Sequence, residues 1–137
     1  MMPAAIYIRS ARRNPLSMWE QQETCEDYAR SLGADLQMIY GDVGRTREGL
    51  RMLTDDVTAG KIDAVFVTDL YRLGRKLEDF REVTDAIREA GCPIYEAGPR
   101  RLVSWDTPAG RLSIGISYHL GFTEPFTEQE EAAQIES

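Results

Sequence analysis

The sequence predicts a single α/β domain of three layers, with a mostly parallel sheet of four to five strands and helices on both faces. The first observation is alternation: strand-length apolar runs take turns with helix-length amphipathic segments, which is the pattern of a covered parallel sheet. The second is length, because 137 residues can bury one core without disulfide bonds. We expect the domain to span residues 1–122, followed by an acidic, disordered tail over 123–137.

The chain begins with a predicted strand over residues 4–9 (AAIYIR) and then a helix. A capping box of Ser17 and Glu20 predicts that this helix runs from Met18 to Leu32, and Gly33 suits its left-handed C-terminal cap. Part of its apolar face is expected to come from four side chains: Trp19, Cys25, Tyr28 and Leu32.

The next segment predicts a second strand over 36–40, a polar loop over 41–47 (GDVGRTR) and a second helix. The loop contains glycine and is of the kind that carries functional residues. The helix is defined by three apolar residues at helical spacing and ends at Gly60. These residues are Leu50, Leu53 and Val57.

The second half of the chain contains the strand expected at the sheet centre, a continuous apolar run over 62–68 (IDAVFVT). An amphipathic helix follows and ends at Gly91, with an apolar face made of Leu77, Phe80, Val83 and Ile87. Residues 93–97 predict a fourth strand, 100–105 a short edge strand and 108–122 a final helix.

Arginines stand at the ends of two predicted buried strands. Arg9 lies in YIRSA (7–11), and Arg72 and Arg75 lie in YRLGR (71–75). A guanidinium can hold two phosphate oxygens at once and stays charged at any physiological pH. Open α/β sheets bind ligands at the carboxyl edge of their strands. The arginines therefore indicate a phosphate-binding site at that edge and point towards nucleic-acid chemistry.

These two segments resemble the N-terminal catalytic domain of the serine recombinases, the resolvase and invertase family. That family has Y-x-R-V-S in its first strand and D-R-L-[SG]-R after a later one. Three further elements extend the resemblance to about residues 5–124. They are Gln21 and Cys25 in a Q-x-x-x-C-x-x-Y-A helix pattern, Arg47 in REGL where the family has R-P-G-L, and DTPAGRL over 106–112.

The resemblance implies the resolvase fold and site-specific DNA recombination, in which a serine hydroxyl attacks the scissile phosphodiester and forms a 5′-phosphoserine link. No metal or other cofactor is implied. Arginines would neutralise the charge that builds on the phosphoryl oxygens. The implied phosphate-binding set in this chain is Arg9, Gln21, Arg47, Arg72 and Arg75.

One departure from the family concerns the nucleophile itself. The family serine stands two positions after the first-strand arginine, where this chain has Ala11, which has no hydroxyl. Ser10 is present, but in an extended strand it would point to the opposite face from Arg9. Tyr71 stands where the family usually has an aspartate, and Asp69, two residues upstream, is a candidate substitute.

Two functions of different classes follow. In the first, the domain is catalytically silent and acts as a regulatory or oligomerisation module, bound to a partner recombinase or to another copy of itself. In the second, a β-bulge near residues 9–11 turns Ser10 into the pocket, and the protein is an active DNA strand-transfer or nicking enzyme. A third alternative is an unrelated nucleotide-like ligand at the same sheet edge.

Some residues near the arginines stay open between site and surface roles, namely Asp69, Tyr71 and Arg45. Tyr71 could stack on a neighbouring arginine, and Arg45 is expected in solvent. The arginine pair of YRLGR could instead form surface salt bridges with Glu78 and Asp79.

Charge limits the partners. The chain has 16 basic and 23 acidic residues, a net charge of −7, which opposes DNA binding by this chain alone. Five glutamates and no basic residue lie in 124–137, so the rest is nearly neutral; this tail could alternatively mimic phosphate and occupy the arginine pocket. We expect DNA binding only with a partner protein, through a homo-oligomer or association with another recombinase.

The location of the protein is expected to be cytoplasmic. Its two cysteines, Cys25 and Cys92, form no disulfide framework and have no metal-ligand spacing, which suits a reducing compartment. The apolar runs are too short to cross a membrane, and the first residues lack the pattern of a secretory signal.

Overall fold

The computed structural model describes residues 2–74, 76–105, 107 and 114 of the chain. The predicted final helix over 108–122, the predicted acidic tail and Arg75 lie outside these residues, apart from Ile114. Within the described part, every helix is too short or too polar to cross a membrane.

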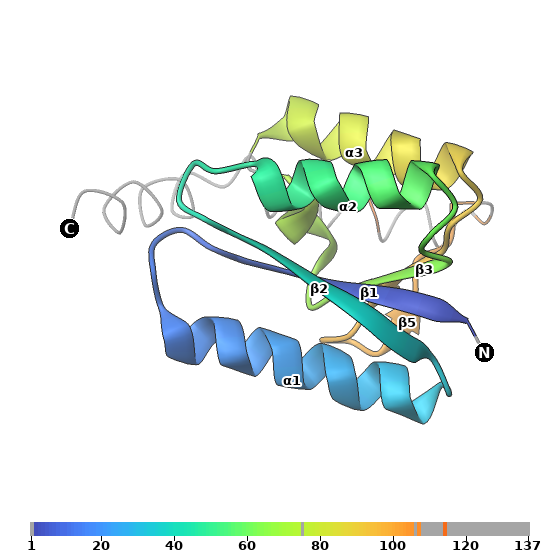
Figure 1. The fold of residues 1–137 in the computed structure, drawn as a ribbon, viewed down its shortest axis with the longest axis horizontal. Coiled ribbons are helices and arrows are strands. Elements are labelled where there is room, and N and C mark those ends of the chain that lie inside the picture. The colour runs from blue at the N-terminus through green and yellow to red at the C-terminus, as the bar shows by residue number, and fades with distance from the viewer. Residues whose placement is uncertain (1, 75, 106, 108–113, 115–137) are drawn as a thin grey trace.

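The described strands form one five-stranded sheet in the order β2-β1-β3-β4-β5 (Figure 1). Their bounds are β1 Pro3–Ser10, β2 Asp35–Val43, β3 Ala64–Val67, β4 Ile94–Glu96 and β5 Arg101–Leu102. The first four strands pair in parallel, and β5 runs antiparallel to β4. The predicted fold class is confirmed, and the strand expected at the centre, β3, lies in the middle of the sheet.

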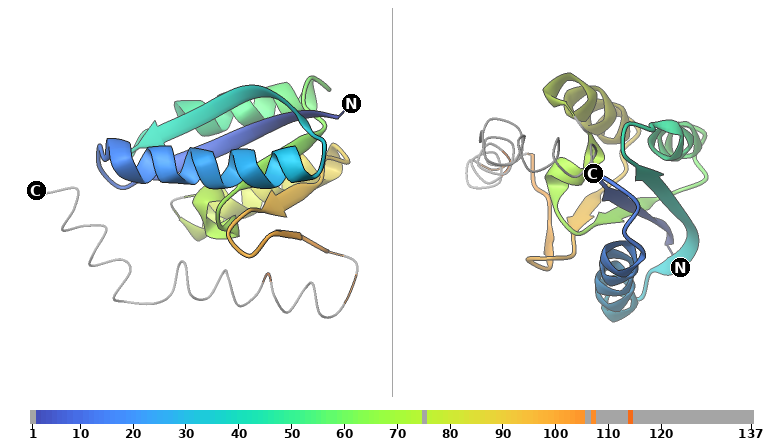
Figure 2. Two further views of the ribbon diagram at one scale, coloured as in Figure 1. Left: turned by 90° about the horizontal axis from the view of Figure 1, so that it is seen from below. Right: turned by 90° about the vertical axis from the view of Figure 1, so that its left-hand side faces the viewer.

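Helices cover both faces of this sheet (Figures 1 and 2). Helix α1, Pro15–Ser31, lies on one face, whereas α2, Glu48–Thr58, and α3, Leu77–Glu89, lie side by side on the other. A 3-10 turn, η1, Leu70–Leu73, follows β3 at its carboxyl end. The layers place the β1–α1 loop, the β2–α2 loop and η1 at one edge of the sheet.

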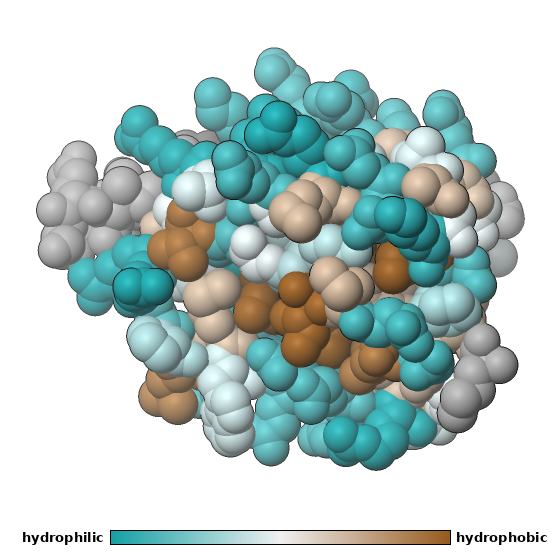
Figure 3. Space-filling model, in the orientation of Figure 1, coloured by the Kyte–Doolittle hydropathy of each residue, from teal (hydrophilic) through white to brown (hydrophobic). Residues whose placement is uncertain are grey.

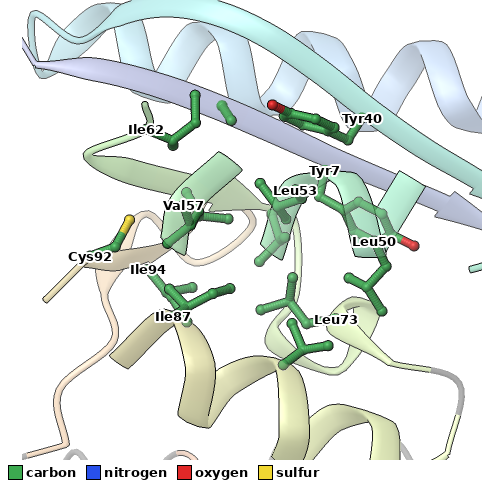
Figure 4. Packing of buried hydrophobic residues seen from close by; sticks show 14 of the residues in the cluster. Tyr7, Tyr40, Leu50, Leu53, Val57, Ile62, Leu73, Ile87, Cys92 and Ile94 are labelled. Carbon is green, nitrogen blue, oxygen red and sulfur yellow. The ribbon is translucent and has the colours of Figure 1, made fainter. Parts of the chain in front are cut away.

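Two cores result from the alternation of side chains along the strands. The core between α1 and the sheet contains Cys25 and Tyr28 of α1, together with Ile6, Ile8 and Phe66 of the strands. The larger core fills the space between the sheet and helices α2 and α3 and is drawn in Figure 4. Its fully buried members include Tyr7, Leu50, Leu53, Phe80 and Ile87. Within β1, Ile6 and Ile8 therefore face α1, while Tyr7 faces α2 and α3.

The start of α1 differs from the prediction. The helix begins at Pro15, and the Asn14 side chain caps it by accepting a hydrogen bond of 3.1 Å from the Ser17 amide. Proline suits the first helical position because its φ is already helical and it has no N–H left unpaired there. The predicted capping box of Ser17 and Glu20 is therefore wrong.

The predicted apolar face of α1 is only half right. Cys25 and Tyr28 are buried, but Trp19 is 57% and Leu32 45% exposed. Trp19 lies well round the helix from Cys25 and away from the sheet, and Leu32 lies beyond the last residue of the helix. Gly33, with φ of 72°, adopts the left-handed conformation that was predicted.

Strand β2 is longer than predicted and shortens the loop that follows it. Gly41 and Asp42 were assigned to the loop, but they pair with Ile8 and Arg9 of β1. The strand is also the edge of the sheet, and its Met38 and Ile39 side chains are each 44% exposed. Figure 3, in the orientation of Figure 1, shows apolar side chains gathered along the middle of the molecular surface that faces the viewer.

Gly49 sets how closely α2 approaches β2. A β-carbon at this position would lie 2.8 Å from the Gly41 carbonyl carbon and still closer to the carbonyl oxygen. Both atoms belong to the backbone of a strand, which cannot move aside as a flexible side chain does. The close approach of helix and strand therefore requires glycine in the REGL element.

We expect Gly49→Ala to lower the free energy of unfolding by about 3 kcal/mol or more, because the methyl group would collide with backbone. Gly60→Ala is the matched control: its φ is 78°, but nothing lies within 4 Å of the added carbon. It should cost only about 1 kcal/mol, from the left-handed conformation alone. Urea unfolding measures both, and equal losses would contradict the steric explanation.

Candidate functional site

The backbone of Arg9 is held by the side chain of Gln21. The Arg9 amide donates to Gln21 Oε1 at 3.0 Å, and Gln21 Nε2 donates to the Arg9 carbonyl oxygen at 2.8 Å. Arg9 is only 4% exposed and Gln21 only 5%. The side-chain amide thus satisfies both polar backbone groups of Arg9 and joins the end of β1 to α1.

Arg72 reaches the same point from η1. Its Nη1 donates to the Arg9 carbonyl oxygen at 3.0 Å, across 63 residues of sequence. Three of the predicted site residues, Arg9, Gln21 and Arg72, therefore meet at the carboxyl edge of β1. This is the edge at which the sequence placed the arginines.

The guanidinium of Arg9 is bonded to the loop between β2 and α2. Its Nη2 donates to the Gly44 carbonyl at 2.9 Å, and its Nη1 donates to Tyr7 Oη at 3.1 Å and to the Thr46 carbonyl at 3.4 Å. The Asp42 carboxylate lies 4.0 Å from Nη1. The Nε atom of Arg9 is buried without a hydrogen-bond partner in the described part of the chain, and so is the Nε atom of Arg72.

Asp42 organises the start of α2. This residue is 4% exposed. Its carboxylate accepts hydrogen bonds from the amides of Gly49 and Leu50, both at 2.9 Å, from Thr46 Oγ1 at 3.0 Å and from Tyr7 Oη at 2.7 Å. A negative charge is stabilised at a helix N-terminus, where it also satisfies amides that have no partner within the helix.

Tyr7 links Asp42 to Arg9. Burial, reinforced by the hydrogen bond to Asp42, raises the pKa of the Tyr7 phenol, so the hydroxyl stays neutral. It accepts from Arg9 and donates to Asp42, so a neutral hydroxyl bridges the guanidinium and the carboxylate. The sequence pattern did not single out Asp42. Its signal is the register, because Asp42 pairs with Arg9 once β2 is extended to Val43.

Ser10 lies on the other side of the strand from the Arg9 guanidinium. Pairing of β1 with β2 is continuous from Tyr7 to Ser10, and the one register shift between these two strands falls between Ala4 and Ala5. Alternation from Ile8 therefore directs Ser10 towards α1. Ser10 is 7% exposed, and its Oγ donates to the Arg12 carbonyl. The half-buried Ala11 follows it.

Arg47 has a partner in α3. Its Nη2 lies 3.0 Å from Asp79 Oδ1, and its side chain is 52% exposed. The sequence offered Asp79 as a partner for the YRLGR arginines; among the described residues Asp79 pairs with Arg47, and Arg75 lies outside those residues. Arg47 follows Thr46, whose carbonyl accepts from Arg9, so it borders the site. Arg45 is exposed, as expected.

The remaining open residues lie around η1. The Arg72 guanidinium stacks over the Tyr71 ring at 5.7 Å, which matches the structural interpretation of Tyr71. Asp69 precedes η1, and its charge affects Cys25 of α1. Burial raises the pKa of the Cys25 thiol to about 12, and the negative charge of Asp69 adds to this increase.

Among the described residues, no group of three or more histidine, cysteine or acidic side chains could hold a metal ion.

We expect Asp42→Asn to lower the free energy of unfolding by about 3 kcal/mol, because an amide nitrogen would replace an oxygen that accepts from buried donors. The more exposed Asp35, whose carboxylate bonds only to Gln37 in the described residues, provides the control Asp35→Asn. This change should cost less than about 0.5 kcal/mol. Chemical denaturation at pH 7 measures both, and similar losses would count against the capping role.

Cys25 should make stability fall in alkaline solution. Its pKa is raised in the folded state, so between about pH 9 and pH 12 the folded protein binds more protons than the unfolded chain. Stability is fully present below this window and is lost through it, by up to about 1.4 kcal/mol per pH unit. The stability difference between the protein and Cys25→Ala should therefore narrow from pH 8 to pH 10.5 in urea unfolding. A constant difference would contradict the shift.

Comparisons with known proteins agree with this fold. Similar solved structures include the N-terminal catalytic domain of TP901-1 integrase, with 22% identity, a TM-score of 0.67 and coverage of 87% of this chain and 93% of that one. A resolvase family site-specific recombinase from Streptococcus pneumoniae has 16% identity and a TM-score of 0.70, with 98% and 97% covered. The C-terminal catalytic domain of ISC1926 TnpA, an IS607-like serine recombinase, has 20% identity and a TM-score of 0.62, with 98% and 94% covered.

At such identities the solved structures show the fold alone. No curated protein matches the sequence. The family described as "Resolvase, N terminal domain" matches residues 4–125. Since this match spans nearly all of the chain, the protein belongs to the resolvase N-terminal domain family.

Proposed function

We propose that this chain is a catalytically silent serine-recombinase domain that acts as a regulatory or oligomerisation module in site-specific DNA recombination. Family membership associates the chain with recombination. The observation that carries the silent assignment is Ala11, a methyl group at the position that corresponds to the nucleophile. An alkyl side chain cannot form a bond to phosphorus, so electrostatic stabilisation by arginines has no attacking oxygen to assist.

The position of Ser10 supports this proposal. The alternative function requires a bulge near residues 9–11, but β1 and β2 pair without interruption through Arg9 and Ser10, the last residue of β1. For Ser10 to attack a phosphate beside Arg9, its hydroxyl must leave the Arg12 carbonyl and the end of β1 must turn over. That rotation would also break the two hydrogen bonds between Gln21 and the Arg9 backbone.

The arginines still suit a phosphate-binding role on this scaffold. Arg9 and Arg72 lie together, with a buried Nε on each that has no partner in the described residues. To grip a phosphate with its two terminal nitrogens, Arg9 must exchange the carbonyls of Gly44 and Thr46 for phosphate oxygens. A phosphate oxygen carries part of a negative charge and is a stronger hydrogen-bond acceptor than a neutral carbonyl oxygen. DNA would therefore displace the Gly44 and Thr46 carbonyls from Arg9. Gln21, Arg47 and Arg75 complete the proposed set.

The overall charge determines how such a domain reaches DNA. With a net charge of −7, the free chain is repelled by the phosphate backbone, whose neutralisation supplies most of non-specific affinity. Binding would therefore occur next to a partner that supplies the basic surface, either a second copy of this chain or an active recombinase. We place this association in the cytoplasm.

We expect the protein to form no covalent adduct with supercoiled DNA, and Ser10→Ala to behave identically. Ala11→Ser restores a hydroxyl at the position that corresponds to the family's nucleophile, one residue beyond the end of β1, and should raise the yield of denaturant-stable protein–DNA adduct at least about tenfold above the assay background. Gel electrophoresis of labelled plasmids with randomised inserts measures the yield, with every variant carrying the same oligolysine tag to supply the basic surface that the free chain lacks. Ala11→Ser combined with Arg9→Ala is the control that should remove the adduct.

An adduct formed by the unchanged protein and abolished by Ser10→Ala would overturn the silent assignment. It would establish the strand-transfer alternative, because Ser10 would then be the attacking group.

A further inference from the structure

We propose that Glu96 is a positioning residue, which fixes η1 so that Arg72 reaches the end of β1. This inference rests on the proposed function, because Arg72 belongs to the proposed phosphate pocket. The residues that carry it lie at the end of β3, on η1, in and just after β4, and on β5. Of these, Arg72 belongs to a motif that carries the family resemblance, whereas Glu96 and Arg101 do not.

Both oxygens of the Glu96 carboxylate are used. Oε2 accepts from the Leu70 amide at 2.8 Å, and Oε1 accepts from Arg101, with Nε at 2.9 Å and Nη2 at 2.8 Å. Glu96 is 3% exposed, whereas the Arg101 side chain is 44% exposed. A buried carboxylate is costly unless its charge and its oxygens are satisfied, and here one cation and one amide satisfy them.

The Leu70 amide is the first of η1, so the bond from Glu96 is made at the start of that turn. Backbone bonds support it on the preceding residues: the Ala97 amide donates to the Val67 carbonyl at 2.7 Å, and the Gly98 amide donates to the Thr68 carbonyl at 2.9 Å. A β-carbon on Gly98 would lie 2.8 Å from the Thr68 oxygen. The turn after β4 therefore fixes, through these hydrogen bonds, the segment that leads from β3 into η1.

Only one residue separates Leu70, which bonds to Glu96, from Arg72, which reaches the proposed phosphate pocket. Arg72 is two residues beyond Leu70, and its amide closes η1 by donating to the Asp69 carbonyl at 3.0 Å. Leu70 and Leu73 are fully buried, which limits movement of the turn as a whole. Apolar packing does not select one rotation of the turn, but the Leu70 N–H bond to a fixed carboxylate is directional. Glu96 thereby orients the turn that places Arg72 Nη1 on the Arg9 carbonyl.

The test uses the full chain and a double-mutant cycle of Glu96→Gln with Arg72→Ala. Affinity for a labelled DNA duplex is measured by fluorescence anisotropy, with every variant of the full chain carrying the same oligolysine tag, which supplies the basic surface that the free chain of net charge −7 lacks. Because Glu96→Gln also removes a negative charge, affinities are compared with those of Glu89→Gln, which makes the same charge change at an exposed site of α3. We expect Glu96→Gln to weaken binding about threefold to tenfold relative to this control, and to have no further effect in the Arg72→Ala background.

A second measurement does not depend on DNA. The Nε–Hε signal of Arg72 in a nitrogen–proton NMR spectrum, identified by its loss in Arg72→Ala, should shift in Glu96→Gln and keep its position in Glu89→Gln. Arg101→Gln removes the ion pair but leaves the Glu96 bond to Leu70, so it should lower stability while leaving this signal near its place. Glu96→Asp, whose carboxylate is one methylene shorter, serves if the glutamine variant does not fold.

The outcomes separate the two proposals. An unmoved Arg72 signal in a folded Glu96 variant, or additive losses of Glu96→Gln and Arg72→Ala, would overturn the positioning role. If instead Arg72→Ala leaves DNA affinity unchanged, the phosphate pocket of the proposed function fails, while the NMR signal still decides whether Glu96 positions Arg72.

Discussion

The burial of Arg9 is the constraint on which the arrangement of the site depends. A guanidinium taken out of water must find partners for its donors and a charge to offset its own. Its backbone recruits Gln21 from α1 and Arg72 from η1, and its side chain recruits the carbonyls of Gly44 and Thr46. One residue at the end of β1 therefore ties together the three segments that meet at this edge of the sheet.

Asp42 supplies the negative charge that offsets the buried Arg9 guanidinium, and the neutral hydroxyl of Tyr7 bridges the two groups. Tyr7 lies between Arg9 and Asp42, while the same carboxylate caps α2. The position of α2 and the conformation of the loop are thus coupled to the state of Arg9. A phosphate that draws the Arg9 guanidinium away from Gly44 and Thr46 would therefore act on the loop and on the start of α2 together.

The sequence predicted the layers and the edge at which the arginines meet, because alternation and the end of each strand are local properties. It did not predict Asp42, since that requires knowing that β2 continues for three residues past Tyr40 and pairs with Arg9. It misplaced the start of α1, because Asn14 and Pro15 cap the helix before the apolar pattern begins. The pairing of Arg47 with Asp79 depends on how α2 and α3 pack together, which their separate apolar faces leave undetermined.

The scaffold of the site and the chemistry of attack are separable in this molecule. The side-chain hydrogen bonds that hold Arg9 at the end of β1 involve Gln21, Arg72 and the 42–46 loop, and none of these bonds uses a side-chain atom of residue 11. If residue 11 is the nucleophile position, as we propose, a methyl group there would remove the attacking oxygen without loosening the arrangement around Arg9. In the proposed function, such a domain would keep the fold of its family and lack the attacking oxygen, which is the physical condition for a silent partner of an active recombinase.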